Sequence, residues 1–392
     1  MTEAARRKDG AAELEALADR AAAARDSATA RRLLEQATAL DPGRGEAWLK
    51  LSAMCRAQRD LPAALAAISG ALKLDPLAFL PLLLKGSLLE QAGQKEAAAE
   101  TYGHALAQQP DEIAPQLTGL VQRAVQTHAA YLDEKAERLR LAGAEAAPSL
   151  GPSERARLER FRSNILRRTR PYHSEPTDFH YPGLREREYH GREDFPWLER
   201  LEAATEAIAE DFRRVMAAER TELVPYIEYP EDLPLRQWAE LNRNPAWTAI
   251  HLVRNGTIVD ANARHCPATM ALLGALDQPD IPGRGPNAMF SLLAPGAHIP
   301  PHTGVANTRL VCHLPLIVPP GCWFRVGAET REWKVGRAWV FDDTIEHEAM
   351  NPSDQLRVIL IVDTWHPDLS KPERDAVAAV MAATDPGAGA GL

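Results

Sequence analysis

The stretch "HIPPHTGVANTRLVCHLPLIVPPG", from His298 to Gly321, places three of the chain's twelve histidines among prolines and a β-branched, apolar run. Further along, "FDDTIEHEAMNPSDQLRVILIVDTW" adds His347, and Arg357 begins its last apolar segment. A histidine buried in a core is usually single and hydrogen-bonded. Several histidines and an arginine at the ends of predicted strands therefore indicate a binding or catalytic site.

The surrounding sequence from about residue 246 is a series of short predicted strands. "WTAIHLVRNG", "AMFSLLA", "TRLVCHLPLIV", "CWFRVG", "REWKV", "RAWVFDD", "HEAM" and "LRVILIVDTW" are separated by turn signals such as "PPG" and "NPSD". Many short strands with few helices between them predict a sandwich or barrel that closes on itself. We expect a jelly roll of the cupin type, a double-stranded β-helix, whose inner faces surround a pocket. Ahead of it, residues 195–219 predict one amphipathic helix.

The first third of the chain repeats with a period of 34 residues. Small residues that let paired helices approach closely recur at this period, and a proline ends each unit. The pattern resembles the tetratricopeptide repeat. The positions that carry it are Pro42, Pro76 and Pro110, then Ala30, Ala64 and Ala98, then Ala37, Ala71 and Ala105, with the bulky Leu34, Ile68 and Tyr102.

Together these patterns predict a multidomain α plus β protein. An α-helical tetratricopeptide-like array is expected over residues 12–125, and a helical connector and linker over 126–172. The jelly-roll domain is expected over 173–372, and a C-terminal helix and flexible tail over 373–392.

Bulk properties narrow the possible functions. The 392 residues carry a net charge of −9, so we expect no nucleic-acid partner. The most apolar stretch, residues 77–89, is interrupted by Pro81, Lys85 and Gly86, and no membrane partner is expected. The N-terminal residues contain no apolar signal segment, and the four cysteines have no CxxC spacing. The expectation is a cytoplasmic protein.

Two of the histidines have the positions of metal ligands. His302 and His347 lie at the ends of neighbouring predicted strands, and imidazole suits iron, zinc, copper and nickel. The facial triad of non-haem iron enzymes adds a carboxylate, commonly two residues after the first histidine, where this chain has Gly304. From these residues alone the metal stays open.

The segments "FSLLAPGAHIPPHTG", "NTRLVCHLPL", "FDDTIEHEA" and "RVILIVDTWHP" together resemble the aspartyl/asparaginyl β-hydroxylase family over roughly residues 175–370. The family consists of iron(II)- and 2-oxoglutarate-dependent oxygenases, and its members bind iron through two histidines with a glycine at the third position. The resemblance thus implies His302 and His347 as iron ligands. It implies Arg357 as the partner of the distal carboxylate of 2-oxoglutarate, and Ser291 and His313 as further cosubstrate contacts.

The function implied is hydroxylation, with O2, of a C–H bond in a peptide or protein side chain that the repeats help to capture. Some family members have a second arginine two residues before the histidine matching His313, assigned to the substrate's acid group, and this chain has Arg309 but Val311 there. An Asp or Asn of an epidermal-growth-factor-like domain is therefore doubtful as the substrate. The alternatives are a hydroxylase of a free amino acid or other small molecule, a repeat-based binding protein with an inactive jelly roll, and a zinc or nickel cupin.

Other polar residues near these motifs receive structural interpretations. His298 is expected in a loop and His366 at the end of the last strand, both outside the site. Asp342 and Asp343 could orient His347 or cap the turn at Thr344, and the turn is favoured.

Strand alternation places Cys312 opposite His313, in the core.

Overall fold

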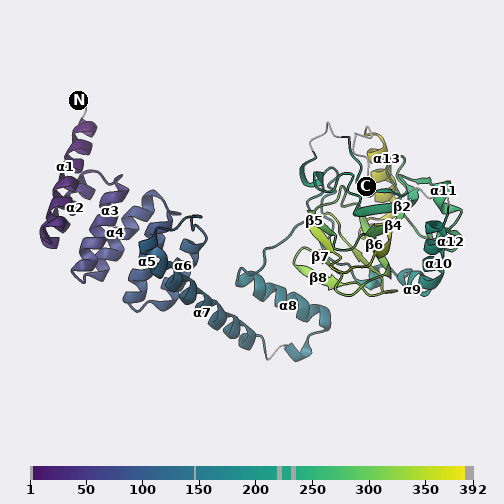
Figure 1. Ribbon diagram of the computed structural model, residues 1–392, viewed down its shortest axis with the longest axis horizontal. Helices are drawn as coiled ribbons and strands as arrows, with labels where there is room; N and C mark the ends of the chain where they lie inside the picture. Colours follow the sequence, from purple (N-terminus) through teal and green to yellow (C-terminus); the bar gives the residue numbers. More distant parts are fainter. Residues whose placement is uncertain (1–2, 145–146, 219–222, 231–234, 385–392) are drawn as a thin grey trace. The chain divides into compact units, whose positions relative to one another are not determined.

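The computed structural model describes residues 3–144, 147–218, 223–230 and 235–384. The chain divides into two compact units, residues 1–166 and 167–392 (Figure 1). Residues 385–392 of the predicted tail and residues 145–146 of the predicted linker lie outside the described residues.

The first unit consists of helices packed in consecutive antiparallel pairs (Figure 1). The repeating positions found in the sequence are its core: Ala30, Ala64 and Ala98 are fully buried, as are Ile68 and Tyr102. The helices are α1 (Glu3–Ala23), α2 (Ser27–Leu40), α3 (Gly45–Ala57), α4 (Leu61–Leu74), α5 (Phe79–Gln91), α6 (Lys95–Leu106), α7 (Thr118–Ala142) and α8 (Pro152–Ile165).

Glycines allow aromatic rings to lie against neighbouring helices of this unit. A Cβ atom at Gly86 of α5 would lie 2.4 Å from the Tyr102 ring of α6. A Cβ atom at Gly70 would lie 2.6 Å from the Trp48 ring. The predicted helical repeat array is therefore confirmed by its own packing.

The second unit contains two antiparallel sheets. The larger has the strand order β1-β2-β4-β11-β6-β9, with β3 paired to β2, and the smaller has the order β5-β10-β7-β8. The strands are β1 (Val224–Pro225), β2 (Trp247–Arg254), β3 (Thr257–Ile258), β4 (Ala288–Leu293), β5 (His298–His302), β6 (Arg309–Ile317), β7 (Trp323–Val326), β8 (Glu329–Glu332), β9 (Trp339–Phe341), β10 (His347–Met350) and β11 (Arg357–Trp365). The predicted α plus β fold class is confirmed.

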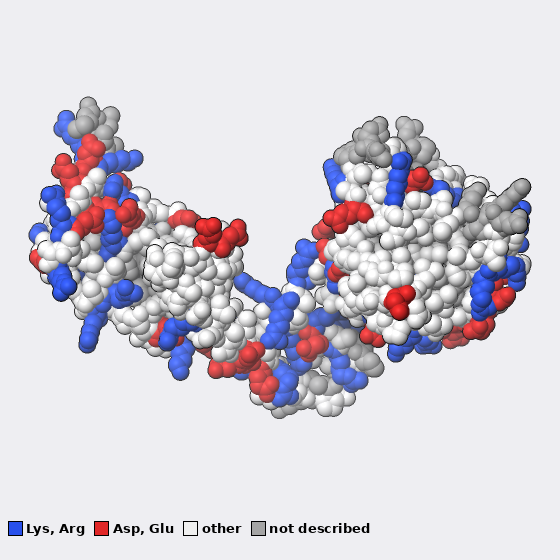
Figure 2. Space-filling view, in the orientation of Figure 1, with Lys and Arg blue, Asp and Glu red and all other residues white. Residues whose placement is uncertain are grey.

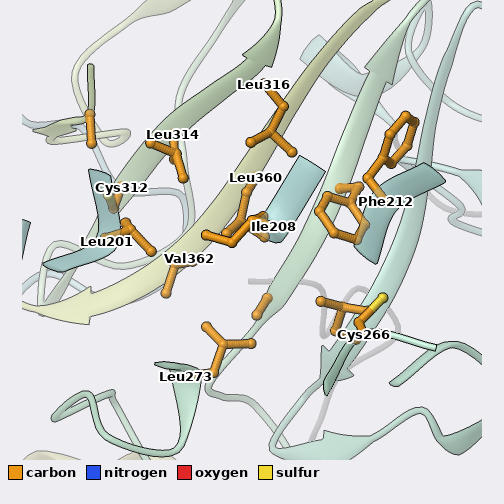
Figure 3. Packing of buried hydrophobic residues seen from close by; sticks show 14 of the residues in the cluster. Leu201, Ile208, Phe212, Cys266, Leu273, Cys312, Leu314, Leu316, Leu360 and Val362 are labelled. Atoms are coloured by element: carbon orange, nitrogen blue, oxygen red, sulfur yellow. The ribbon is translucent and has the colours of Figure 1, made fainter. Parts of the chain in front are cut away.

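Helices cover one face of the larger sheet. They are α9 (Leu198–Ala203), α10 (Thr205–Met216), α11 (Asp260–Ala263) and α12 (Pro267–Leu273), while α13 (Lys371–Ala382) follows the last strand. Figure 3 shows Leu201, Ile208 and Phe212 packed with strand residues that include Cys312 and Leu360. The prediction of one continuous helix over residues 195–219 was wrong, because the chain breaks at Ala204, where the Thr205 hydroxyl donates to the carbonyl of Glu202.

A second core lies between the two sheets. Met289, Val311 and Ile359 of the larger sheet pack there with Ile299 and Phe324 of the smaller. The alternation of β6 directs Cys312 to the helix-covered face and His313 to this inner face, as predicted. The expectation of a loop at His298 was wrong, because His298 is the first residue of β5 and pairs with Met350.

The visible surface carries acidic and basic side chains intermixed over both units, with no separate basic face in this view (Figure 2). Among the helices of the described residues, none has the length and apolar character needed to cross a membrane.

Candidate active site

The two predicted metal ligands lie side by side on the smaller sheet. His302 ends β5 and His347 begins β10, and the two residues are directly opposite in the antiparallel pairing. Their ring centroids are 4.1 Å apart. Both side chains are about nine-tenths buried, so the imidazoles form a pair in the protein interior.

Backbone carbonyls determine which nitrogen of each imidazole is available. Nδ1 of His302 lies 2.8 Å from the carbonyl oxygen of Pro300, and Nδ1 of His347 lies 3.1 Å from that of Ile345. Each Nδ1–H therefore donates, which leaves Nε2 as a lone-pair donor. Burial lowers the pKa of His302 to about 3 and that of His347 to about 4, so both rings are neutral at physiological pH. Two neutral imidazoles with free Nε2 atoms fit a transition-metal ion.

The third-ligand position has no side chain. A Cβ atom at Gly304 would lie 2.2 Å from Oδ2 of Asp343, so the carboxylate of Asp343 fills the space that a side chain at 304 would need. Among the described residues, no group of three or more His, Cys, Asp and Glu side chains is arranged to hold a metal ion. The donor set around a metal here would be the two imidazoles alone.

Arg357 lies on the larger sheet and is 2% exposed. Its Nη1 is 3.3 Å from the hydroxyl oxygen of Ser291, and its Nε makes no hydrogen bond. No carboxylate of the described residues pairs with it, and burial lowers the pKa of Arg357 to about 9. Nδ1 of the nearby buried His313 also makes no hydrogen bond. A buried guanidinium without a counter-ion is costly, and a carboxylate ligand would supply the missing charge.

One cavity of about 280 Å³ connects these groups. The sheets bring all five predicted site residues to its wall, which is formed by Ser291, His302, His313, His347 and Arg357 together with apolar and aromatic side chains. The aromatic wall includes Trp238 and Trp247, whose rings lie 5.4 and 5.9 Å from that of His302. The larger sheet contributes the arginine end of the cavity and the smaller sheet contributes the imidazole pair.

A buried ion network in the same cavity was not predicted. Nη2 of Arg309 donates to Oδ2 of Asp343 over 3.0 Å, and Nη1 of Arg309 lies 3.4 Å from Oδ1 of Asp363. Burial disfavours the charge, but the two carboxylates raise the pKa of Arg309 above its usual value. Period-two alternation from His313 along β6 and from Arg357 along β11 was the available signal, because it places Arg309 and Asp363 on the cavity face.

Asp342 accepts hydrogen bonds from the backbone and hydroxyl of Thr344, as a turn cap does. The side chain of Asp343 does not cap this turn, because it accepts a hydrogen bond from Arg309 instead. His298 pairs with Glu348 and His366 contacts the Arg185 carbonyl, and neither lines the cavity.

Comparisons with known proteins find relatives of the part of the chain that carries this site. Residues 202–367 match the model of the family described as aspartyl/asparaginyl beta-hydroxylase. The aspartate beta-hydroxylase domain-containing protein 2 of Homo sapiens is 39% identical over 153 residues, which cover 38% of this chain and 42% of that protein. The aspartyl/asparaginyl beta-hydroxylase of Mus musculus is 32% identical over 186 residues, which cover 47% of this chain and 25% of that protein. The chain thus spans less than half the length of these relatives.

Among solved structures, the OM64 TPR domain of Arabidopsis is 14% identical with a TM-score of 0.28 and covers 31% of this chain and 98% of that chain. The repeat array is established by the helix packing described above and not by this score. The match to the family model spans the strands that carry both imidazoles and the buried arginine. Residues 202–367 of this chain are therefore similar to the aspartyl/asparaginyl β-hydroxylase family over the strands that carry the candidate site.

Proposed function

We propose that this chain is an iron(II)- and 2-oxoglutarate-dependent dioxygenase that hydroxylates a C–H bond in a side chain of a peptide or protein. One observation carries the proposal: a buried arginine that pairs with no carboxylate of the described residues shares a cavity with two imidazoles whose Nδ1 atoms are engaged and whose Nε2 atoms are left to bind a metal. A metal and a dicarboxylate are the ligands that would satisfy both groups at once.

The chain's own residues would bind and orient the reactants. His302 and His347 would hold the metal through Nε2, because their Nδ1 atoms are already engaged by backbone carbonyls. Arg357 would bind the distal carboxylate of 2-oxoglutarate with its planar donor fork, with Ser291 and His313 beside it.

The surrounding aromatic rings would exclude water from the reactants. Bound iron(II) supplies, with O2 and 2-oxoglutarate, the oxidising chemistry that no amino-acid side chain provides. In the net reaction, one oxygen atom of O2 enters the substrate C–H bond and the other enters succinate, while 2-oxoglutarate loses CO2.

A zinc or nickel cupin, or a binding protein with an inactive domain, is less well supported. Neither function needs a buried guanidinium that lacks a carboxylate partner within the described residues, and such a group destabilises the fold unless a ligand pairs with it. The repeat array favours a peptide or protein substrate, because stacked helical pairs offer an extended surface to such partners.

The test is succinate formation by the purified full chain in a cell extract supplied with 2-oxoglutarate. We expect it to require added iron(II), to be blocked by the cosubstrate mimic N-oxalylglycine, and to accompany a gain of one oxygen atom in a product seen by mass spectrometry. Equal turnover with zinc alone would overturn the oxygenase proposal.

A further inference from the structure

The cavity wall near the imidazole pair contains a charged group that the proposed metal and cosubstrate contacts leave unused. Along β6, Arg309, Val311 and His313 all line the cavity. Arg309 is 3% exposed and Asp343 is 7% exposed, so both are buried. Asp343 also lies against the third-ligand position at Gly304. This pair is therefore next to the proposed metal site, where the reacting carbon of a substrate would lie.

The pair has unused hydrogen-bonding capacity of both kinds. Nε of Arg309 makes no hydrogen bond, and neither does Oδ1 of Asp343, while Nη1 of Arg309 has only the 3.4 Å ion pair with Asp363. Asp363 differs, because its Oδ2 accepts from both the backbone and side-chain nitrogens of Asn287. Arg309 thus offers hydrogen-bond donors, and Asp343 offers an acceptor. A buried polar group that stays unpaired is costly, so these atoms indicate a ligand with a matching acceptor and donor.

The charge balance argues against an anionic ligand at this position. Arg309 faces two carboxylates, those of Asp343 and Asp363, at 3.0 and 3.4 Å. The apolar Val311 separates it from the cosubstrate end of the wall. Among the described residues that line the cavity, the other two cations are Arg357, which the cosubstrate takes, and Arg254, which is exposed. The charge of the proposed iron(II) is offset by the 2-oxoglutarate dianion, so a substrate carboxylate would meet Asp343 without a further free cation among the described residues.

Resting on the oxygenase function proposed above, we infer that the hydroxylated side chain is a carboxamide, and that the corresponding carboxylate is rejected. Its oxygen accepts from Arg309 and its amino group donates to Oδ1 of Asp343. Carboxamide and carboxylate have nearly the same shape, so the discrimination comes from hydrogen bonding and charge. A site discriminates strongly between two ligands when binding of the wrong one leaves a buried polar group unpaired. We therefore expect a preference for the carboxamide of at least about tenfold.

The first test uses the full chain with iron(II), 2-oxoglutarate and two libraries of short peptides that differ only in a central Asn or Asp. Hydroxylated peptide is measured by mass spectrometry, and we expect at least about tenfold more product from the Asn library. Equal or greater reaction of the Asp library would overturn the inference, as would iron-dependent consumption of 2-oxoglutarate with neither library hydroxylated. Absence of any iron-dependent 2-oxoglutarate consumption would instead overturn the proposed function.

The second test changes the acceptor. Asp343→Asn keeps the shape but removes one of the two carboxylates facing Arg309, so the Asn-to-Asp product ratio should fall by about tenfold or more. Asp342→Asn is the matched control, because it makes the same substitution at the neighbouring residue, which caps the Thr344 turn and does not line the cavity.

The ratio should be unchanged in that control. It is measured within each variant, so loss of folded protein does not alter it. The same ratio in both variants would overturn the inference.

Discussion

Two backbone carbonyls determine which nitrogen of each imidazole can bind a metal. Each contacted carbonyl belongs to the residue two positions before the histidine, Pro300 for His302 and Ile345 for His347. The local chain therefore fixes both rings before any ligand binds. In metal sites, hydrogen bonds of this kind hold the ligand imidazoles in the orientation that the metal needs.

The residue types of the site could be predicted from the sequence, but the ion network could not. The sequence motifs predicted five site residues, and the sheets bring all five to one cavity: Ser291, His302, His313, His347 and Arg357. Arg309 and Asp343 are 34 residues apart and lie on a strand and a turn. Alternation along a strand gives the face of a residue but not its partner, so the pairing needed the three-dimensional structure.

A histidine outside the cavity should make the second unit sensitive to acid. His190 is buried against the rings of Phe195 and His366, and neither ring nitrogen makes a hydrogen bond. Burial lowers the pKa of His190 from 6.5 to about 3. As the pH falls below 6.5, the unfolded state gains a proton that the folded state does not, so the free energy of unfolding decreases by up to about 1.4 kcal/mol per pH unit.

We therefore predict that His190→Phe becomes progressively more stable relative to the parent between pH 6 and pH 4. Urea denaturation at each pH measures the difference in unfolding free energy between the two proteins. The contributions of the other buried histidines cancel in it, because both proteins contain them. His180→Gln is the control at an exposed histidine and should follow the parent. Parallel curves for His190→Phe and the parent would contradict the account.

At the scale of elements, the regular helical repeats were easier to predict than the irregular strands. The 34-residue period arises from small residues that face each other in each helix pair, and these residues are the buried alanines. The segment "HIPPH" has two prolines, which lack the backbone donor of a strand. It forms β5 because it is the edge strand of the smaller sheet, where one side needs no partner. Pairing at an edge depends on neighbours distant in sequence, which a local pattern does not contain.

The close helix contact at Gly86 gives a prediction about the array. Gly86→Ala places a methyl group 2.4 Å from the Tyr102 ring, a clash with a buried aromatic side chain. Overpacking of this kind costs about 1–3 kcal/mol, which outweighs the roughly 1 kcal/mol gained by replacing a helical glycine. The midpoint of denaturation, followed by circular dichroism, should therefore fall.

Gly119→Ala is the matched control, because nothing lies within 4 Å of its Cβ position in α7. Its midpoint should stay the same or rise. A Gly86→Ala variant as stable as Gly119→Ala would show that the contact does not constrain the helix pair.

At the scale of the whole molecule, the cavity belongs to one unit. Its lining residues run from Tyr226 to Asp363, all within residues 167–392. The proposed binding of metal and cosubstrate therefore concerns this unit alone, and the proposed contribution of the repeats concerns the substrate.

The most direct test of the account is calorimetric titration of 2-oxoglutarate into the full chain with iron(II) under nitrogen. We predict binding that requires the metal in the parent, and no iron binding in His302→Ala. Truncating a buried partner of a carboxylate costs about 2–5 kcal/mol, so Arg357→Ala should raise the Kd for 2-oxoglutarate by about 30-fold or more while iron still binds. Arg357→Lys, which keeps the charge but not the fork, should lie between the two. Binding of 2-oxoglutarate to Arg357→Ala as tightly as to the parent would contradict the assignment of this cavity.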